Sequence, residues 1–228
     1  MRTGILGGTF NPIHYGHLRP AEEVREALGL DQVRFIPLDT PAHKTEEDIA
    51  PSEDRVEMVR LALEDHPFFV CDSSEVERGG VSYTVDTLSA LAEGTCRGHE
   101  LFFIIGADAF SLLGTWKDPR GVLEKAHFAV TLRGEQNADE VIHTLHEEFK
   151  GTNTHIGFKK IQDNEFELLD INGRICFVPV TTLDISGTMI RNLARTGGSL
   201  RYLLPPQVEG FIIRRGLYGN QGKITARR

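Results

Sequence analysis

Short runs of consecutive apolar residues alternate with amphipathic segments along this chain, and this alternation restricts the fold more than any other feature. The runs contain many β-branched and aromatic residues and occupy positions 4–7, 33–37, 68–71, 101–105, 128–132 and 175–178. Continuous apolar runs are typical of strands covered on both faces. Residues 17–28, 53–64 and 82–91 place apolar side chains at helical spacing. Strands alternating with helices predict an α/β fold with a Rossmann-like, doubly wound parallel sheet and right-handed crossovers.

The stretch from about 134 to 173 differs from the rest because it is rich in Asp and Glu and contains one weak helical pattern, at residues 141–149. We interpret it as an acidic excursion from the sheet rather than an independent domain. A strand, a polar turn at residues 181–187, a helix from about Thr188 and a last helix beginning at Pro205-Pro206 follow. The sequence therefore predicts a single domain over residues 1–228, with a small C-terminal helical segment over residues 186–228.

Size and charge narrow the classes of protein. The 228 residues, 40% of them hydrophobic, suffice for one large domain with a sizeable core. Lys plus Arg number 25 and Asp plus Glu 33, which gives a formal net charge of −8. This balance argues against a nucleic-acid partner, because affinity for phosphate backbones needs clustered cations. It leaves room for a small anionic substrate, since a few local cations can serve a pocket.

The three cysteines, Cys71, Cys96 and Cys176, fit neither a disulfide framework nor a zinc ribbon, because they are odd in number and widely spaced. Cys71 and Cys176 lie inside apolar runs, which predicts buried and inert thiols. The N-terminal apolar run is too short for a signal peptide, and no later run reaches the roughly 18 to 20 apolar residues of a membrane span. The sequence predicts a cytoplasmic protein without a membrane partner and leaves open whether it forms a homo-oligomer.

The segment over residues 4–18 is the most informative about function. An apolar strand runs into Gly7-Gly8, which lets the backbone approach a ligand, and a helix follows from about Tyr15. The carboxyl end of the first parallel strand is where ligands bind, and the N-terminus of the next helix attracts phosphate. His14 and His17 are three residues apart and face the same way on the first helical turn. We therefore expect two imidazoles that can donate hydrogen bonds to phosphate oxygens.

Other interpretations of this loop fit less well. A dinucleotide-binding loop needs G-x-G-x-x-G, whereas these glycines fall as G-x-x-G-G, and no Walker P-loop motif occurs in the chain. A metal site built on His14 and His17 has no third ligand at a suitable spacing, so the sequence predicts no metal ligand. The two histidines could also simply fill a loop.

The loop resembles a known signature. Residues 8–17 match the G-x-F-x-P-x-H-x-G-H motif of the nucleotidylyltransferase superfamily. Residues 185–191, Ile-Ser-Gly-Thr-Met-Ile-Arg, resemble its second motif, I-S-[ST]-T-x-I-R. Gly187 stands where the family has Ser or Thr, so a backbone N–H would have to replace one side-chain contact with phosphate.

Further segments resemble the bacterial nicotinate-nucleotide adenylyltransferases within this superfamily. They are residues 36–44, 81–88, 101–108 with Trp116, 202–205 and 216–218. The resemblance covers nearly the whole chain except about 134–173. The usual pair of prolines before the histidine is Pro41-Ala42 here.

The resemblance implies the reaction. The phosphate of nicotinate mononucleotide would attack the α-phosphorus of ATP, releasing pyrophosphate and leaving nicotinate adenine dinucleotide in NAD biosynthesis. The expected partners are thus ATP and nicotinate mononucleotide. Mg²⁺ is the expected cofactor because ATP arrives as its magnesium complex, and phosphates and water would hold the ion.

The resemblance also implies roles for individual residues. The residues expected to be catalytic are His14, His17, Lys44 and Arg191. Those expected to bind ATP are Gly8, Thr9, Phe10, Gly106, Asp108, Ser186, Thr188 and Arg191. Those expected to bind nicotinate mononucleotide are Lys44, Ser82, Tyr83, Thr84, Trp116 and Arg133.

Some of these residues also have ordinary structural explanations. Ser186 and Asp108 lie where helices would begin, so either could be an N-cap. A single tryptophan such as Trp116 is most often in a core, although its polar neighbours favour a loop. Lys44 could be one solvated lysine among many.

Three alternative functions remain open at this point. A sister adenylyltransferase would use nicotinamide mononucleotide or phosphopantetheine instead. A catalytically silent nucleotide sensor could share the fold, although it would not need both histidines together with Lys44 and Arg191. A fragment of a class I aminoacyl-tRNA synthetase has a related histidine loop, but the acidic charge and the missing lysine-rich second motif argue against it.

Overall fold

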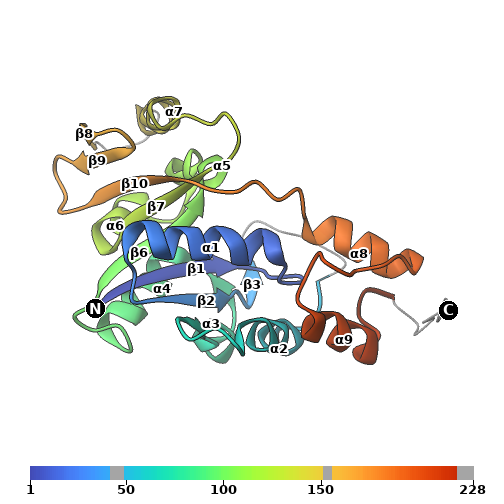
Figure 1. The fold of residues 1–228 in the computed structure, drawn as a ribbon. Helices are drawn as coiled ribbons and strands as arrows, with labels where there is room; N and C mark the ends of the chain where they lie inside the picture. Colours follow the sequence, from blue (N-terminus) through green and yellow to red (C-terminus); the bar gives the residue numbers. More distant parts are fainter. Residues whose placement is uncertain (42–48, 151–155, 220–228) are drawn as a thin grey trace. The chain divides into compact units, whose positions relative to one another are not determined.

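The computed structural model describes residues 1–41, 49–150 and 156–219 (Figure 1). Within these residues the main sheet has eight strands in the order β4-β2-β1-β6-β7-β10-β9-β8. Their bounds are β1 Arg2–Gly8, β2 Gln32–Pro37, β4 Phe69–Cys71, β6 Glu100–Gly106, β7 His127–Leu132, β8 Phe158–Gln162, β9 Glu165–Leu168 and β10 Arg174–Pro179. Strands β1, β6, β7 and β10 pair in parallel in that order. Two short strands, β3 (Thr40–Pro41) and β5 (Val81–Ser82), pair separately.

Helices connect the strands of the sheet, as the alternating pattern predicted. Their bounds are α1 Tyr15–Leu28, α2 Ser52–Leu63, α3 Ser74–Arg78, α4 Thr84–Glu93, α5 Ala107–Phe110, α6 Pro119–Lys125, α7 Ala138–Lys150, α8 Gly187–Thr196 and α9 Pro206–Arg215. Two short turns of 3-10 type are η1 (Leu113–Thr115) and η2 (Leu217–Gly219). The Rossmann-like α/β fold class is therefore confirmed.

The chain divides into two compact units. Unit 1 consists of Met1–Gly7, Pro20–Arg34 and the described part of Ser82–Thr182. Unit 2 consists of Gly8–Arg19 and the described parts of Phe35–Val81 and Leu183–Arg228. The boundary passes through β1, α1 and β2, so these elements contribute to both units.

The core of unit 1 is built on the central strands. All five residues from Leu101 to Ile105 are buried, and so are the five from Phe128 to Leu132. This is the burial expected of strands covered on both faces, which is why their apolar runs are continuous. Phe103 and Phe128 contact each other across the two strands, with ring centroids 5.8 Å apart.

The acidic stretch does not leave the sheet, contrary to our expectation for residues 134–173. After helix α7, strands β8 and β9 form a hairpin that pairs antiparallel with β10 and extends the sheet (Figure 1). Strand β9 alternates, with Phe166 and Leu168 buried and Glu167 exposed. Such alternation is typical of an antiparallel strand with one solvated face. The strand was not predicted because it contains no continuous apolar run.

Three phenylalanines in contact and two packed helices form part of the core of unit 2. Phe35 lies between Phe10 and Phe69, with ring centroids 5.9 Å and 4.9 Å away. Helix α2 packs against α9. An ion pair joins them, because Arg215 Nη2 lies 2.9 Å from a carboxylate oxygen of the buried Asp54.

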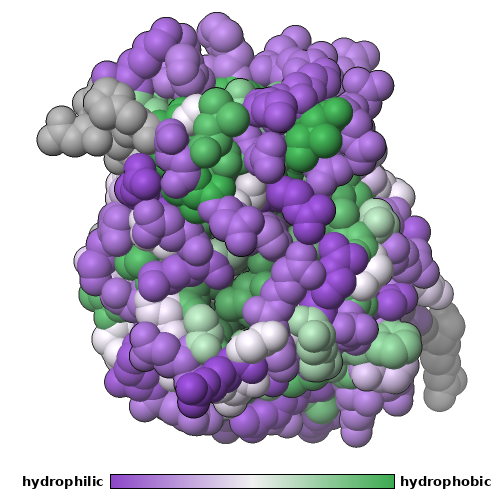
Figure 2. Space-filling model, turned by 90° about the vertical axis from the view of Figure 1, so that its left-hand side faces the viewer, coloured by the Kyte–Doolittle hydropathy of each residue, from purple (hydrophilic) through white to green (hydrophobic). Residues whose placement is uncertain are grey.

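Hydrophilic residues dominate the face shown in Figure 2, and hydrophobic ones gather in smaller areas between them. Large apolar side chains that stay exposed include Leu112, Ile161 and Leu169. No helix among the described residues has both the length and the apolar character needed to cross a membrane.

The cysteines only partly match the expectation of buried thiols. Cys96 is buried, whereas Cys71 and Cys176 are half-buried, and all three are free. Burial raises the pKa of the Cys71 thiol and that of the Cys176 thiol to about 11. A thiol of this pKa is inert at neutral pH because the thiolate is the reactive form.

We therefore predict that Cys71 and Cys176 resist alkylation in the folded protein. At pH 8 only about one thiol in a thousand would be ionised, against roughly a quarter for an unperturbed cysteine. Iodoacetamide labelling followed by mass spectrometry should show both sites reacting about a hundredfold more slowly than in urea-unfolded protein. Equal labelling of folded and unfolded protein would contradict the prediction.

Candidate functional site

The first loop, residues 9–14, connects β1 to α1 and places the two predicted histidines side by side in unit 2. The backbone N–H groups of His17 and Leu18 donate to the carbonyl of His14, at 2.8 and 3.2 Å, so the first turn of α1 begins there. The ring centroids of His14 and His17 are 3.8 Å apart. The i, i+3 spacing therefore brings the imidazoles together as the sequence predicted.

A backbone hydrogen bond fixes which nitrogen of His17 can donate. The N–H of His14 donates to Nδ1 of His17 at 3.3 Å. Because Nδ1 accepts, the proton of a neutral His17 lies on Nε2, and Nε2 becomes the donor of the ring. This is the arrangement needed for a hydrogen bond from His17 to an anionic oxygen.

Phe10 supports His17 from inside unit 2. Its side chain is only 2% exposed, and its ring meets that of His17 edge-on at 5.2 Å. Any contact of Phe10 with a ligand must therefore come from its backbone, which has a φ of 45°. Gly16 on the other side lets the loop close, because a Cβ there would lie 2.9 Å from the His14 ring and 3.0 Å from the carbonyl of Ile185.

The second motif meets the first loop through Arg191. This arginine on α8 is 9% exposed, and its Nη1 donates to the carbonyl of Asn11 at 2.9 Å. Its Nη2 lies 3.3 Å from Oγ1 of Thr188. Ser186 is the N-cap of α8, with its hydroxyl accepting from the N–H of Met189 at 3.2 Å. The structure thus brings both motifs together within unit 2.

Gly187, the departure from the family motif, has a steric explanation. A Cβ at this position would lie 2.9 Å from the carbonyl oxygen of Asn11 and 3.2 Å from Nη1 of Arg191. The absence of a side chain therefore lets the start of α8 approach the same carbonyl that Arg191 binds. Apart from the N–H of Met189, which donates to Ser186, the N–H groups at the N-terminus of α8 are polar groups that this turn can offer to an anion.

From the sequence we assigned no role to Arg55, which binds the backbone of the first loop at Thr9. Its guanidinium is 1% exposed and donates to four backbone carbonyls, those of Ala50, Thr9, Leu38 and Asp39, at 2.6 to 3.0 Å. Burial lowers the pKa of this guanidinium, and the carboxylate of Asp39 acts in the opposite direction. The signal in the sequence is a charged residue one turn before Val59, on the buried stripe of α2.

Asn11 and Tyr218 are two further residues to which the sequence assigned no role. Asn11 is 5% exposed, and its Oδ1 accepts from the hydroxyl of Tyr218 at 2.8 Å and from the N–H of Ala50 at 3.1 Å. Both residues lie inside segments that resemble the family, so the motifs did contain them. Their pairing is a contact over 207 positions, which no local pattern reveals.

Other predicted residues lie in unit 1. Gly106 ends β6 and is the N-cap of α5, which excludes the N-cap explanation for Asp108. Asp108 instead accepts from Nε2 of Gln136 at 2.9 Å. Gln136 Oε1 in turn accepts from the N–H of Arg133, at 2.8 Å, after the end of β7. One glutamine therefore links two of the predicted residues.

The predicted pyridine-nucleotide residues lie around α4 and η1 of unit 1. Ser82 is buried, and Tyr83 and Thr84 begin helix α4. The ammonium group of Lys117 lies 4.5 Å from the centre of the Tyr83 ring. Trp116 is half-buried after η1, with its ring edge-on to Phe103 at 6.2 Å, so it lies in a loop beside the core.

Lys44 lies outside the described residues, and the remaining predicted residues, Gly8 and Thr9, lie at the end of β1 and in the first loop. No group of three His, Cys, Asp or Glu residues in the described part of the chain could hold a metal ion.

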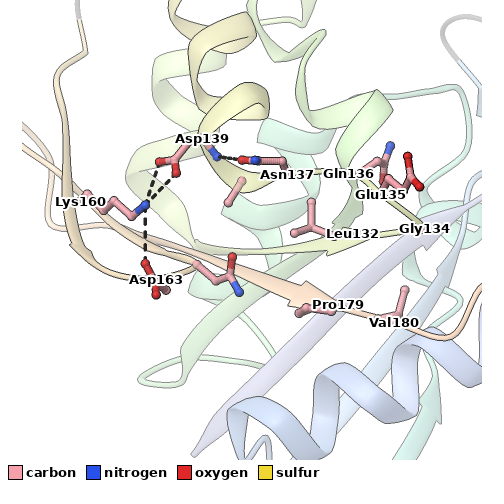
Figure 3. A pocket seen from close by; sticks show the side chains of 12 residues that line it. Leu132, Gly134, Glu135, Gln136, Asn137, Asp139, Lys160, Asp163, Pro179 and Val180 are labelled. Carbon is pink, nitrogen blue, oxygen red and sulfur yellow. Dashed lines mark hydrogen bonds and ion pairs between the residues drawn. The ribbon is translucent and has the colours of Figure 1, made fainter.

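A cavity of about 540 Å³ opens at the carboxyl ends of β7 and β10 in unit 1 (Figure 3). Leu132 and Val180 form part of its apolar lining. Lys160 points toward two carboxylates there, with Nζ 2.7 Å from Asp139 and 3.7 Å from Asp163. Its charge is therefore compensated locally.

Ligands of open α/β sheets bind at loops that follow the carboxyl ends of the strands. Such a sheet, with the motifs of residues 8–17 and 185–191 in contact within unit 2, is typical of nucleotide-binding α/β transferases. Comparison with known proteins gives the family. The pattern of the cytidylyltransferase-like family matches residues 5–193. A protein of Desulfatibacillum aliphaticivorans named "Probable nicotinate-nucleotide adenylyltransferase" is 41% identical over 218 residues, covering 96% of this chain and all of that protein. A protein of the same name from Geobacter sulfurreducens is 40% identical, covering 97% of this chain and all of its own.

The chain therefore belongs to the cytidylyltransferase-like family and, within it, to the nicotinate-nucleotide adenylyltransferases, which are nucleotidyltransferase enzymes. A solved structure agrees in fold. It is the Plasmodium falciparum nicotinic acid mononucleotide adenylyltransferase complexed with NaAD, with a TM-score of 0.68 and 13% identity. The alignment covers 96% of this chain and 97% of that one.

Replacing Gly187 with alanine tests the close approach to Asn11. Intrinsic helix propensity favours alanine in α8, but the added Cβ would clash with a backbone carbonyl. We expect Gly187→Ala to lower the free energy of unfolding by about 1–3 kcal/mol, measured by urea denaturation. Gly114→Ala is a suitable control, because its nearest neighbour would be 3.5 Å away. Unchanged or increased stability of Gly187→Ala would contradict the steric explanation.

Proposed function

We propose that this enzyme transfers AMP from ATP to nicotinate mononucleotide, giving nicotinate adenine dinucleotide and pyrophosphate in NAD biosynthesis. The names of relatives that match nearly the whole chain support this activity. Within the structure, the observation that supports it most is the meeting of two motifs in unit 2. Arg191 donates to the carbonyl of Asn11, three residues before the His14–His17 pair. The guanidinium of α8 and the imidazoles at the start of α1 thereby lie at the same loop, which supplies the charge and the hydrogen-bond donors that a triphosphate requires.

We propose that these groups bind and activate the triphosphate. Both reactants are anions, so the enzyme has to bring like charges together and stabilise the charge that grows on the α-phosphoryl group. Positioning and electrostatics do this without a covalent intermediate. Nε2–H of His17 and the ring of His14 would donate to phosphate oxygens. Ser186, Thr188 and Arg191, with the N-terminus of α8, would hold the outer phosphates.

Residues of unit 1 are proposed to bind the remaining parts of the substrates. Trp116 would stack on the pyridine ring, and the segment Ser82–Thr84, with Arg133, would bind the acid group and phosphate of nicotinate mononucleotide. Asp108, with Gly106, would accept from ribose hydroxyls of ATP. Backbone donors near Thr84 would favour a carboxylate over a carboxamide, because a carboxamide nitrogen leaves those donors unpaired. Lys44 is proposed, on the family motif alone, to neutralise phosphate.

A divalent ion is proposed to arrive with ATP as its magnesium complex. The side chains near the first loop are imidazoles, hydroxyls and guanidinium groups, which bind anions, whereas Mg²⁺ prefers carboxylate, carbonyl and phosphate oxygens. The residues present therefore fit the phosphates rather than the ion itself. Phosphate oxygens and water would hold Mg²⁺, which supplies charge neutralisation on ATP.

On the sequence, we also propose that residues 1–228 act as one domain in the cytoplasm and need no nucleic-acid or membrane partner. The net charge of −8 supports the absence of a nucleic-acid partner.

The choice of acceptor is tested by measuring pyrophosphate release from ATP and Mg²⁺. We expect the highest kcat/KM with nicotinate mononucleotide, when it is compared with nicotinamide mononucleotide and 4′-phosphopantetheine. A preference for either of the others would move the assignment to a sister enzyme. ATP binding without release for any acceptor would indicate a nucleotide sensor.

His17→Ala tests the proposed hydrogen bond to phosphate. Loss of one donor to the developing charge should lower kcat by about 10²- to 10³-fold while the fold is retained. Steady-state pyrophosphate release and circular dichroism measure the two effects. His146→Ala is a matched control, because this side chain lies half-exposed on α7 of unit 1. Turnover of His17→Ala close to that of the wild type would exclude the role.

A further inference from the structure

The short segment after α9 places the side chain of Tyr218 against the first loop. Helix α9 ends at Arg215, Gly216 takes the left-handed conformation with a φ of 62°, and Tyr218 follows with a φ of 60°. The hydroxyl of Tyr218 donates to Oδ1 of Asn11 at 2.8 Å. Burial raises the pKa of this hydroxyl, so it is protonated and able to donate at every pH at which the enzyme would work.

Asn11 is held by three neighbours that all donate to it. Its Oδ1 accepts from Tyr218 and from the N–H of Ala50, at 3.1 Å. Since a backbone N–H can only donate, the atom facing it must be the amide oxygen, and the orientation of the carboxamide is fixed. The backbone carbonyl of the same residue accepts from Nη1 of Arg191. Asn11 therefore binds Tyr218 and Ala50 through its side chain and Arg191 through its backbone carbonyl.

The element that presents Tyr218 is itself anchored. Val208 and Ile212 of α9 are fully buried. Arg215 binds the buried carboxylate of Asp54 on α2, with Nε 3.1 Å and Nη2 2.9 Å from Oδ1. The neighbouring Arg55 of α2 donates to the carbonyl of Thr9 at 2.8 Å. Helix α2 thus holds the loop through Arg55, and the turn η2 that follows α9 holds it through Tyr218.

We propose that Tyr218 is a positioning residue of the ATP site, which acts through Asn11 to fix the first loop in its phosphate-binding conformation. This inference rests on the proposed function, because it assigns the first loop to the triphosphate. Tyr218 need not touch substrate. Its hydroxyl holds the Asn11 side chain, and the Asn11 carbonyl in turn orients the Arg191 guanidinium.

The proposal predicts a selective effect on ATP. Tyr218→Phe keeps the aromatic ring and removes only the hydroxyl, so the packing of the turn is retained. The amide of Asn11 then has one donor fewer, and the loop populates other conformations. A substrate that binds only the ordered loop has an apparent affinity lowered by the fraction that remains ordered. Nicotinate mononucleotide, whose candidate residues in the described part of the chain all lie in unit 1, does not have this requirement.

The experiment measures KM for both substrates, kcat, and the Kd of a nonhydrolysable ATP analogue for wild type, Tyr218→Phe and the control Tyr202→Phe. Tyr202 is suitable as a control because it is 90% exposed. We expect KM for ATP and Kd of the analogue to rise about three- to tenfold in Tyr218→Phe, the size of one net hydrogen bond. KM for nicotinate mononucleotide should change less than twofold, and Tyr202→Phe should match the wild type.

A double-mutant cycle shows whether the effect passes through Asn11. In an Asn11→Ala background, Tyr218→Phe should cause no further loss of affinity for the ATP analogue, because the acceptor is already gone. Additive losses would overturn the proposed route. Three other results would also overturn it, because each indicates a purely structural hydroxyl. They are equal increases in KM for both substrates, a lower melting temperature with unchanged Kd, and failure of Tyr218→Phe to fold.

The outcomes also separate this inference from the proposed function. If wild type binds the ATP analogue but does not turn over nicotinate mononucleotide, the acceptor assignment fails while the Kd comparison still decides the role of Tyr218. If wild type turns over both substrates and Tyr218→Phe is unchanged, only the positioning role fails. If wild type does not bind the analogue, both fail.

Discussion

The hydrogen bond from Arg191 to the carbonyl of Asn11 is the contact on which the arrangement of unit 2 depends. It joins positions 180 residues apart and ends on the loop that leads into the histidine pair. A buried guanidinium is costly unless its N–H groups are bonded. Arg191 and Arg55 both donate to backbone carbonyls, which satisfy these N–H groups without cancelling the positive charge. A chain with a net charge of −8 therefore keeps two buried cationic groups, on α2 and α8, beside the loop that we propose binds an anionic substrate.

The parts that the sequence predicted are those governed by local patterns. Buried strands such as Leu101–Ile105 showed as continuous apolar runs because both faces are covered. Helices showed as apolar stripes at a period of 3.6 residues. The histidine pair followed from the same geometry, since residues three apart share a helical face. The meeting of the two motifs could be predicted only through the resemblance to a family, because nothing local links residue 11 to residue 191.

The parts that the sequence did not predict depend on contacts between distant positions. Arg55 donates to backbone carbonyls, and the side chain of Asn11 accepts from a backbone N–H and from the hydroxyl of Tyr218. Every residue has a backbone carbonyl, and every residue except proline has a backbone N–H. Such contacts therefore leave no pattern of residue types in the partner segment. The β8–β9 hairpin was missed for a different reason. Its alternation is short and lies among acidic residues, so Phe166 and Leu168 did not stand out as a strand. Contacts that hold the backbone of a candidate site are thus harder to predict from the sequence than the side chains that the site presents.

Gly187 is the position at which this chain departs from the second family motif, and the structure gives a steric reason for the departure. A serine or threonine there would add a hydroxyl for phosphate but would also bring a Cβ to 2.9 Å from the Asn11 carbonyl. In this chain the start of α8 lies close to that carbonyl instead, and Arg191 binds the same oxygen. On the proposed function, anion binding would then depend more on backbone N–H groups and the guanidinium than on side-chain hydroxyls. Because backbone groups act only where the backbone is held, the residues that fix the loop become as important as those that touch the ligand.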